Sequence, residues 1–429
     1  MKKILLSILL FASVFGLKAQ TVSDSVMMKP GYTTDIYYSM MNGFVDSANN
    51  STWHLAFAVR PSLFPNNTLQ STSIRINESR GVNVFKSSYT TSQWKTFDTT
   101  GSGTWVSLHD NDSSWDLSAF NYGLNIVPNY NYGWGSYDQA SHDVIGTNVY
   151  LIKIKSGTTY NYRKFMIQRL VYDSQWVFTF SNLDGTDSNT VRITKSAYAN
   201  KLFAYYNLTN KTQFSREPNQ NLWDMVFTYY NTPVFLGPPP AVPYNVAGVL
   251  CNPKSPSARI LHVNKNTITP SSVYLSNQAN NINWDWSNPP KGPPPADYTL
   301  IDSMAFFVQS QADNRPYRLV FTKFTTTDPG KFVFNKQWFQ GTGIAEAKMN
   351  NTSFMVYPNP ASSIVNIVLG SNVKNANINI FDITGKCITT RSILNQTETA
   401  IDITNFNKGI YFISVDVDGI VSSKKFIVE

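Results

Sequence analysis

The sequence has little of what catalytic and metal-binding sites are usually built from. Its 429 residues include two cysteines and four histidines. The patterns HExxH, CxxC and GxSxG do not occur, so the sequence offers no familiar zinc-protease, redox or serine-hydrolase site. Two thiols by themselves cannot form a structural zinc site. We therefore predict that the protein is not an enzyme; a hydrolase whose site these motifs do not reveal is the alternative.

Long apolar runs and blocks of one charge are also scarce. After residue 17, no stretch is apolar for the roughly 20 residues that a membrane-spanning helix needs. Charged residues make up 14% of the chain, and no basic block is longer than the pair Lys424-Lys425. The formal net charge of +8 becomes 8 − 3 = +5 once Lys2, Lys3 and Lys18 are removed. This distribution argues against nucleic-acid binding and against a transmembrane segment in the mature chain.

The two cysteines, Cys251 and Cys387, fall in parts of the chain that we assign below to different domains. Export through an oxidising compartment would permit a disulfide between them. A chain of this size does not need one for stability, so two free thiols are the default. The sequence leaves their disulfide status open.

The first twenty residues have the parts of a secretory signal peptide. Lys2 and Lys3 precede the apolar run ILLSILLFASVFGL, and the small residue Ala19 stands where signal peptidase cuts. We predict that residues 1–19 are removed by cleavage after Ala19. Gln20 then becomes the N-terminus of the exported chain.

Aromatic and small polar residues are what the chain has in quantity. Aromatic residues make up 14%, as many as the charged residues, and Thr, Ser and Asn are frequent. This balance favours half-buried strands over helices. The length is about three times that of a typical single domain. The sequence therefore predicts an all-β protein of two or three packed units.

The last part of the chain, residues 354–429, is a series of short alternating strands separated by turn residues, which fits a small immunoglobulin-like β-sandwich. This segment resembles the type A sorting domain of the type IX secretion system. The matching residues are Tyr357, Pro358, Asn359, Pro360, Asp382, Gly385, Lys386, Gly409, Tyr411, Phe412 and the closing KKFIVE. The resemblance implies contact with the secretion machinery, passage across the outer membrane and release or attachment at the cell surface.

The residues before this domain contain an internal repeat. DIYYSMMNGFVDSANNSTWHLAF is answered by LFAYYNLTNKTQFSREPNQNLWDMVF. The matched pairs are Tyr38 with Tyr206 (206 − 38 = 168), Trp53 with Trp223 (170), Phe57 with Phe227 (170) and, in a later hairpin, Tyr162 with Tyr317 (155). We predict two tandem hairpin-rich β units at residues 20–200 and 201–340, joined to the sorting domain by a linker at 341–353.

Both units resemble the HmuY family of haem-binding surface proteins. The best match is the WDMVF segment that begins at Trp223, followed by PYNVAGVL from Pro243. The resemblance implies haem capture through an axial side chain. However, the positions after the Trp strand that carry His or Met in the family hold neither here. The remaining ligand candidates are His54, Tyr229 and Tyr230, and the cofactor stays unknown.

A second candidate surface is aromatic. NYNYGWGSYDQ in the first unit and NWDWSNPP in the second lie just before the late hairpins. Gly and Pro indicate loops there, and rings exposed on loops suit stacking on a sugar or porphyrin, or contact with a protein. The alternative is that these rings cover the end of a β core. The residues concerned are Tyr130, Tyr132, Trp134, Tyr137, Trp284 and Trp286.

Three carboxylates, Asp110, Asp112 and Asp116, lie close together in HDNDSSWD. The ligand order and the closing Glu of an EF-hand are absent, so we expect a solvated acidic turn and no metal. The sequence as a whole predicts an exported cell-surface binding protein that captures haem or another flat small ligand. The alternative is a surface adhesin or structural protein that contacts glycan or a host or surface protein through aromatic loops.

Overall fold

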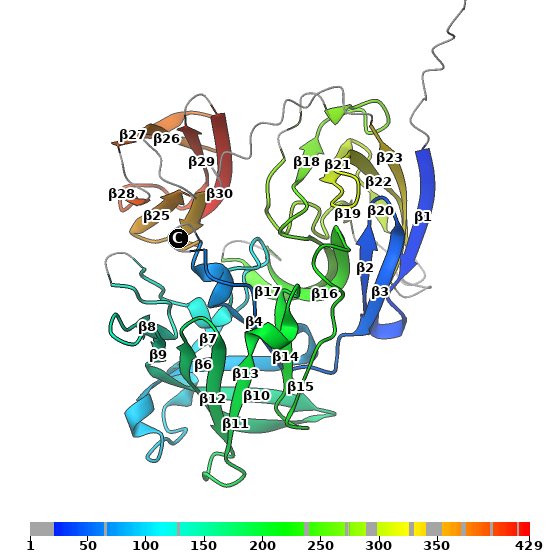
Figure 1. Cartoon of the computed structure of the whole chain (residues 1–429). Helices are drawn as coiled ribbons and strands as arrows, with labels where there is room; N and C mark the ends of the chain where they lie inside the picture. The colour runs from blue at the N-terminus through cyan, green and yellow to red at the C-terminus, as the bar shows by residue number, and fades with distance from the viewer. Residues whose placement is uncertain are drawn as a thin grey trace, which may run out of the picture.

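The computed structural model describes residues 21–63, 67–126, 129–235, 240–270, 273, 275–288, 298–325, 330–339, 354–369, 375–394, 398–417 and 420–429. These residues form strands, short 3-10 helices and turns, so the predicted all-β class is confirmed. The signal peptide predicted at 1–19, with its cleavage after Ala19, and the linker predicted at 341–353 lie outside the described residues. Figure 1 shows the strands grouped into β-sandwiches.

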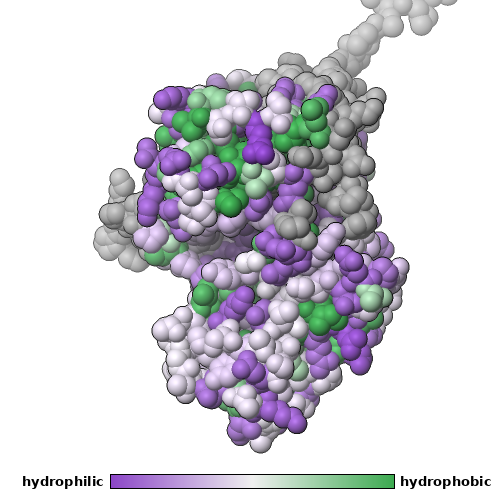
Figure 2. All heavy atoms as spheres, turned by 90° about the vertical axis from the view of Figure 1, so that its left-hand side faces the viewer, coloured by the Kyte–Doolittle hydropathy of each residue, from purple (hydrophilic) through white to green (hydrophobic). Residues whose placement is uncertain are grey.

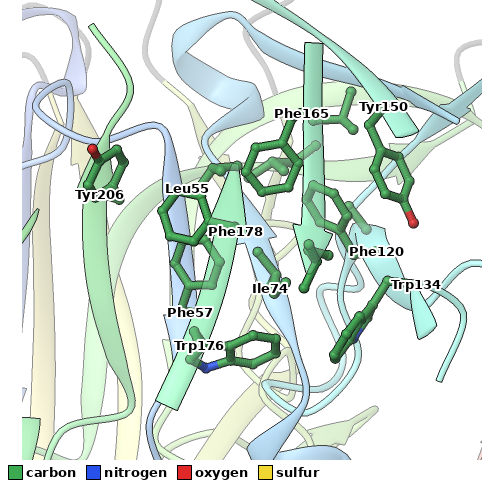
Figure 3. Packing of buried hydrophobic residues seen from close by; sticks show 14 of the residues in the cluster. Leu55, Phe57, Ile74, Phe120, Trp134, Tyr150, Phe165, Trp176, Phe178 and Tyr206 are labelled. Atoms are coloured by element: carbon green, nitrogen blue, oxygen red, sulfur yellow. The ribbon is translucent and has the colours of Figure 1, made fainter. Parts of the chain in front are cut away.

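The first of these, sandwich one, has an eight-stranded sheet facing a four-stranded sheet. The larger sheet has the order β13-β12-β11-β10-β6-β7, with β9 beside β11 and β8 beside β9, and the smaller has the order β15-β14-β4-β5. Apolar side chains from both sheets form one core (Figure 3). The strands are β4 Leu55–Ala58, β5 Ile74–Ile76, β6 Val82–Thr90, β7 Val106–Leu108, β8 Gly135–Tyr137, β9 Val144–Gly146, β10 Asn148–Ser156, β11 Thr159–Val171, β12 Gln175–Ser181, β13 Asn189–Thr194, β14 Phe203–Asn207 and β15 Thr212–Phe214.

Sandwich two repeats this plan with five strands facing four. Its sheets have the orders β1-β23-β22-β21-β18 and β3-β2-β16-β17. The strands are β1 Thr21–Met27, β2 Thr34–Ser39, β3 Gly43–Asn49, β16 Met225–Val234, β17 Val242–Cys251, β18 Ser257–Leu261, β21 Met304–Gln309, β22 Pro316–Thr325 and β23 Lys331–Trp338, with β19 Ser287–Asn288 and β20 Thr299–Leu300 as a separate pair. The 3-10 helices of both sandwiches are η1 Pro30–Tyr32, η2 Leu69–Ser71, η3 Glu78–Arg80, η4 Thr91–Gln93, η5 Ser102–Thr104, η6 Ala119–Asn121 and η7 Lys195–Tyr198.

The two sandwiches exchange their first three strands. By the repeat, β1–β12 form the first half of this region and β13–β23 the second half. β1, β2 and β3 belong to the first half, but in sandwich two β1 pairs with β23 and β2 pairs with β16, with β3 beside β2. β13, β14 and β15 occupy the equivalent places in sandwich one, where β13 pairs with β12 and β14 pairs with β4, with β15 beside β14. The packed units therefore differ from the units predicted at 20–200 and 201–340, because each sandwich takes strands from both ranges.

The registers show that the matched residues occupy equivalent places. Tyr38 lies opposite Met225, and Tyr206 lies opposite Leu55. Tyr206 follows Tyr38 by 206 − 38 = 168 positions, and Met225 follows Leu55 by 225 − 55 = 170. These are the offsets of the predicted repeat, so the two pairs are equivalent in the two sandwiches. In the later hairpin, the β-bulges after Ile167 and after Phe321 match at 321 − 167 = 154. The offset of 155 predicted there is thus one residue too long.

The outer faces of the two four-stranded sheets pack against each other. Tyr37 of β2, Tyr205 of β14 and Val226 of β16 belong to this apolar cluster, which is separate from the two sandwich cores. The sandwiches, which together we call the body (residues 21–339), are therefore four sheet layers deep. A half-buried sheet is expected to be mainly apolar on one face only. The two middle sheets do not follow this pattern, because both of their faces are covered.

The C-terminal domain is a third, smaller β-sandwich. Sheets of the orders β24-β25-β28 and β27-β26-β29-β30 enclose its own core. The strands are β24 Phe354–Tyr357, β25 Ile364–Leu369, β26 Asn375–Asp382, β27 Cys387–Leu394, β28 Glu398–Asp402, β29 Gly409–Val417 and β30 Ile420–Val428. Cys251 is buried in the body, Cys387 is exposed in this domain, and both thiols are free.

Candidate functional site

His54, the first haem-ligand candidate, lies in the interior of the protein. Its side chain is buried, and its Nδ1 accepts a hydrogen bond of 3.0 Å from the backbone N–H of Leu208. Burial lowers the pKa of the His54 imidazole to about 4. The imidazole is neutral, and its Nδ1 already accepts a hydrogen bond inside the protein. His54 therefore stabilises the fold and is not placed to bind a haem iron.

The tyrosine candidates lie apart from His54, at the junction of the two sandwiches. Tyr230 is buried, and its hydroxyl donates to the side-chain oxygen of Asn283. Tyr229 is half-buried and stacks on Tyr32 with ring centroids 5.3 Å apart, while the Arg80 guanidinium lies 5.0 Å from the Tyr229 centroid. Burial is the main cause that raises the pKa of the Tyr229 hydroxyl, which keeps it protonated and a poor metal ligand.

A cavity at this junction is lined by Tyr229, Tyr230 and the buried ion pair of Arg216 and Asp35, whose charged atoms lie 2.6 Å apart. Its volume is about 80 Å³, whereas small-molecule sites begin at roughly 300 Å³. Three donors beside it have no hydrogen-bond partner among the described residues, namely Trp53 Nε1, Trp223 Nε1 and Arg216 Nε. Such a space suits a few ordered waters better than a flat ligand.

Three of the six aromatic loop candidates are core residues. Trp134 is fully buried, and its Nε1 donates to the carbonyl of Thr72 at 2.9 Å. Figure 3 shows it beside Trp176, inside sandwich one. Trp286 occupies the equivalent place in sandwich two (286 − 134 = 152) and stacks on Phe321 with centroids 3.9 Å apart. For these two, and for the buried Tyr132, the expectation of exposed rings is wrong, because the loops fold inward.

Trp284 is half-buried beside the apolar cluster between the sandwiches. Tyr130 is exposed, and Tyr137 beside it is half-buried against the core of sandwich one. Their ring centroids are 6.0 Å apart, and the Tyr137 N–H donates to the Tyr130 carbonyl at 3.0 Å. His142 lies next, 6.0 Å from Tyr137, and Tyr172 follows at 5.6 Å from His142. We call these four residues, Tyr130, Tyr137, His142 and Tyr172, the ring row.

Three of the four residues of the ring row have an unfavourable backbone conformation. Tyr130, His142 and Tyr172 have φ angles of 48°, 59° and 37°. Left-handed backbone costs a residue other than glycine roughly 1–2 kcal/mol, and such outliers persist where the surroundings hold them and are frequent at functional sites. Three large rings adopt it within one surface row, and Tyr172 is 68% exposed, so core packing does not explain its position.

Charged groups, of which Asp143 and Lys195 are buried, hold the turn that carries Tyr172. The Asp143 carboxylate accepts a hydrogen bond of 2.9 Å from the Tyr172 N–H. The neighbouring Asp173 carboxylate accepts from the Ser62 N–H and from the Lys195 ammonium, each at 2.5 Å. Lys195 is buried, and burial lowers the pKa of its ammonium to about 8. The turn is therefore fixed from both sides before any ligand arrives.

His142 and Tyr172 are not among the site residues that we predict from the sequence. His142 follows the loop that begins at Tyr137, and its Nδ1 lies 2.6 Å from the Tyr137 hydroxyl. Tyr172 and Asp173 form the turn between β11 and β12, where a Gly or Asn is usual. A bulky residue at a tight hairpin turn is the signal that could have identified Tyr172.

The acidic segment HDNDSSWD is a connection between the sandwiches. Asp112 accepts hydrogen bonds from Thr232 at 2.7 Å and from Asn280 at 3.2 Å, both in the chain of sandwich two. Asp116 pairs with Arg60. The carboxylates are thus committed to protein groups, which corrects the expectation of a solvated turn. Across the described ranges, no group of three or more His, Cys, Asp or Glu residues could hold a metal ion.

The residues of the sorting motif have structural roles in the C-terminal sandwich. The Tyr357 hydroxyl donates to Glu398 at 2.6 Å, and the Tyr411 hydroxyl donates to the Asn407 carbonyl at 2.9 Å. Asp382 accepts from the Lys386 N–H at 3.1 Å across a turn in which Gly385 has a φ of 86°. The other matched positions lie on the same frame: the Asn359 side chain accepts from the Ile427 N–H, Pro358 and Pro360 flank Asn359, Gly409 opens β29, and Phe412 is exposed on it.

Residues 355–429 match the family described as the secretion system C-terminal sorting domain. This confirms the sorting domain predicted at 354–429 and shows that the protein is exported to the cell surface or the extracellular space. Within the residues that the structure covers, no helix is long and apolar enough to cross a membrane. No curated protein matches the chain, and the resemblance of the body to the HmuY family stays a prediction.

One similar solved structure is the crystal structure of a DUF3244 family protein with an immunoglobulin-like β-sandwich fold from Bacteroides vulgatus. The match has 18% sequence identity and covers 19% of this chain and 87% of the other. The TM-score is 0.17, so this similarity carries no argument about the function of the chain.

Proposed function

We propose that the protein is a cell-surface adhesin that binds glycan through the ring row, without catalysing a reaction. The observation that supports this most directly is the position of Tyr130, His142 and Tyr172. Three rings are held in a costly backbone conformation at the surface, where they add little to the core. An exposed ring face offers a sugar an apolar stacking surface, and loops on a rigid scaffold commonly carry such contacts.

The surroundings of the ring row favour a polar ligand over a large apolar one. Gln139, Ala140 and Ser141 beside His142 are exposed, and Ile145 is the nearest exposed large aliphatic residue to His142 in the sequence. Arg169 pairs with Ile145 across β9 and β11, and its guanidinium lies 3.3 Å from Asp143. Figure 2 shows hydrophobic residues in small groups among polar ones on the face it displays. A row of rings flanked by hydrogen-bonding groups matches the alternating apolar and polar faces of a sugar.

Haem capture has less support. His54, Tyr229 and Tyr230 serve internal contacts, and the cavity beside the two tyrosines is several-fold smaller than a small-molecule site. A flat ligand bound on the ring row itself would be held from one side only. The glycan hypothesis needs no enclosed slot, because stacking on exposed rings suffices.

The test is a glycan array probed with the body, residues 21–339, followed by titration of the best ligand. The variants Tyr130→Ala and Tyr172→Ala should each weaken binding at least tenfold. Tyr160→Ala is the matched control, because Tyr160 is also an exposed tyrosine of sandwich one but lies at the other hairpin of β11. Equal binding by all three variants would reject the ring row as the site.

A titration with haemin separates the two hypotheses. We expect no saturable Soret shift at micromolar haemin. A saturable shift that disappears in the Tyr229→Phe variant but survives Tyr172→Ala would favour haem capture at the sandwich junction and would contradict the adhesin proposal.

A further inference from the structure

The strand exchange makes the connection between β12 and β13 unusual. Residues Asn182–Ser188 join the last strand of the first half to the first strand of the second half. Residues 184–188 are exposed. The hydrogen bonds of this turn are mostly local, such as those from the Thr186 N–H and hydroxyl to Asp184. Outside the turn, Asn182 and Asp187 contact Arg163 of β11, Asp187 also pairs with Lys211, and Leu183 packs against a small apolar cluster. The turn is therefore accessible, and none of these contacts belongs to either sandwich core.

Sandwich two shows that the same pairing needs no such turn. In sandwich one, β13 pairs with β12 through the register Gln175 to Thr194 and is joined to it by the turn. In sandwich two, the equivalent strand β1 pairs with β23, and Thr21 lies opposite Gln337. These two residues are 337 − 21 = 316 positions apart, so hydrogen bonds and packing alone hold β1 in place. Cutting the turn before β13 would give sandwich one the connectivity that sandwich two already has.

The two halves are interlocked through both cores. The first half supplies β2, all six of whose residues are buried in the middle of a sheet of sandwich two. The second half supplies β14, all five of whose residues are buried in the equivalent sheet of sandwich one. Tyr38 and Tyr206 are the core tyrosines on these strands. Separating the halves would expose both cores at once, which makes dissociation as costly as unfolding.

Two short connections favour the exchanged arrangement over a tandem one. Without exchange, β3 and β4 would both flank β2 and run parallel to each other, as β15 and β4 do on either side of β14. A connection between parallel strands usually takes a dozen or more residues. Only residues 50–54 join β3 to β4, and only residues 215–224 join β15 to β16. Both are shorter than that, so the strands reach the other sandwich instead.

We propose that Asn182–Ser188 is a cleavable connection and that the cut protein persists as a stable two-fragment complex. Hydrolysis of one peptide bond in this turn consumes one water and leaves a carboxylate on the first fragment and an amino group on the second. No contact of either core is lost in that step. At a cell surface exposed to proteases, the body would tolerate such a cut without losing the ring row, which lies wholly in the first fragment.

The test inserts a specific protease site between Gly185 and Thr186 of the full chain. After complete cleavage, we expect the two fragments to elute together in gel filtration and to separate only at the urea concentration at which tryptophan fluorescence reports unfolding. The matched control carries the same site after residue 346, where cleavage should release the C-terminal sandwich without denaturant.

Separation of the two body fragments while their fluorescence is still native would overturn the proposal. A second variant with the site inserted between Ser188 and Asn189 guards against a local defect of the first insertion. If both uncut variants fail to fold, the turn is required for the body and the proposal is equally wrong. Glycan binding plays no part in these measurements, so their outcome is independent of the proposed function.

Discussion

Phe178 stacks on Phe57 across the core of sandwich one, with ring centroids 4.7 Å apart and planes inclined by 12°. Phe334 stacks on Phe227 in the same way in sandwich two, at 5.7 Å and 18°. In both cases the two rings come from facing sheets. In each stack, both phenylalanines belong to one half of the body, and a tyrosine from the other half packs beside them.

These stacks should control the stability of the whole body. Phe178→Ala and Phe334→Ala should each lower the free energy of unfolding by about 3–5 kcal/mol, because each leaves a cavity in a closely packed core. Urea unfolding followed by fluorescence should show one transition for both sandwiches, since they are interlocked. Phe412→Ala, an exposed position of the C-terminal sandwich, should change stability by less than about 0.5 kcal/mol. Two separate body transitions would contradict the interlocked arrangement.

Tyr172 of the ring row should lower the stability of the body while it contributes to glycan binding. Tyr172→Asn should raise the free energy of unfolding by about 1 kcal/mol, because Asn tolerates the left-handed backbone that Tyr172 adopts. The same change should abolish glycan binding, since it removes the most exposed tyrosine of the row. Tyr172→Phe keeps the ring and should leave both properties unchanged. A variant with Asn that is no more stable would mean that the turn is not strained.

His54 should make the body sensitive to acid. Its folded-state pKa, about 4, is lower than the value of 6.5 in an unfolded chain. Between pH 6.5 and 4 the unfolded chain binds a proton that the folded protein refuses, so stability falls as the pH falls. The loss attributable to His54 is about 3 kcal/mol.

His54→Asn provides the comparison, because the amide oxygen can still accept from the Leu208 N–H. Asp110 acts in the opposite direction: burial raises the pKa of its carboxyl to about 6, so its contribution grows as the pH falls. The difference between the wild type and His54→Asn, measured by urea unfolding at pH 7 and pH 4.5, isolates the histidine. Identical pH profiles would rule out this role for His54.

The buried pair of Arg216 and Asp35 should behave as one unit. Both side chains are 6% exposed. Arg216→Met should cost about 3–5 kcal/mol of stability, because it leaves the Asp35 carboxylate buried without its cation. The double variant Arg216→Met/Asp35→Leu should cost clearly less than the sum of the single changes, by about 1 kcal/mol or more. Additive costs in this cycle would show that the two groups do not stabilise each other.

Removal of residues 354–429 should leave a folded body that stays inside the cell envelope. The C-terminal sandwich has its own core, and the sorting family matches that part of the chain alone. Cell fractionation and circular dichroism of the truncated protein test the two parts of this expectation. Full-length protein carrying Tyr160→Ala should be exported normally. Surface display of the truncated protein would show that another segment directs export.

The sequence predicted some of the candidate site. Tyr130 and Tyr137 are predicted because glycines mark their segment as a loop. The same signal misplaced Trp134 and Trp286, since a loop can fold inward and its glycines do not report burial. His142 and Tyr172 were missed because the ring row is assembled from separate loops, and nothing local in the sequence brings them together.

The strand content, the repeat and the sorting domain follow from the sequence alone, because each depends on a local pattern. These patterns are alternating apolar residues, matched aromatic positions and a series of motif residues. Which half supplies which strand was decided only by the tertiary structure. β2 and β14 are equivalent strands, so each could pair with β4 or with β16 on local grounds. The choice depends on connections too short to turn back and on burying two cores at once, and both are properties of the whole folded chain.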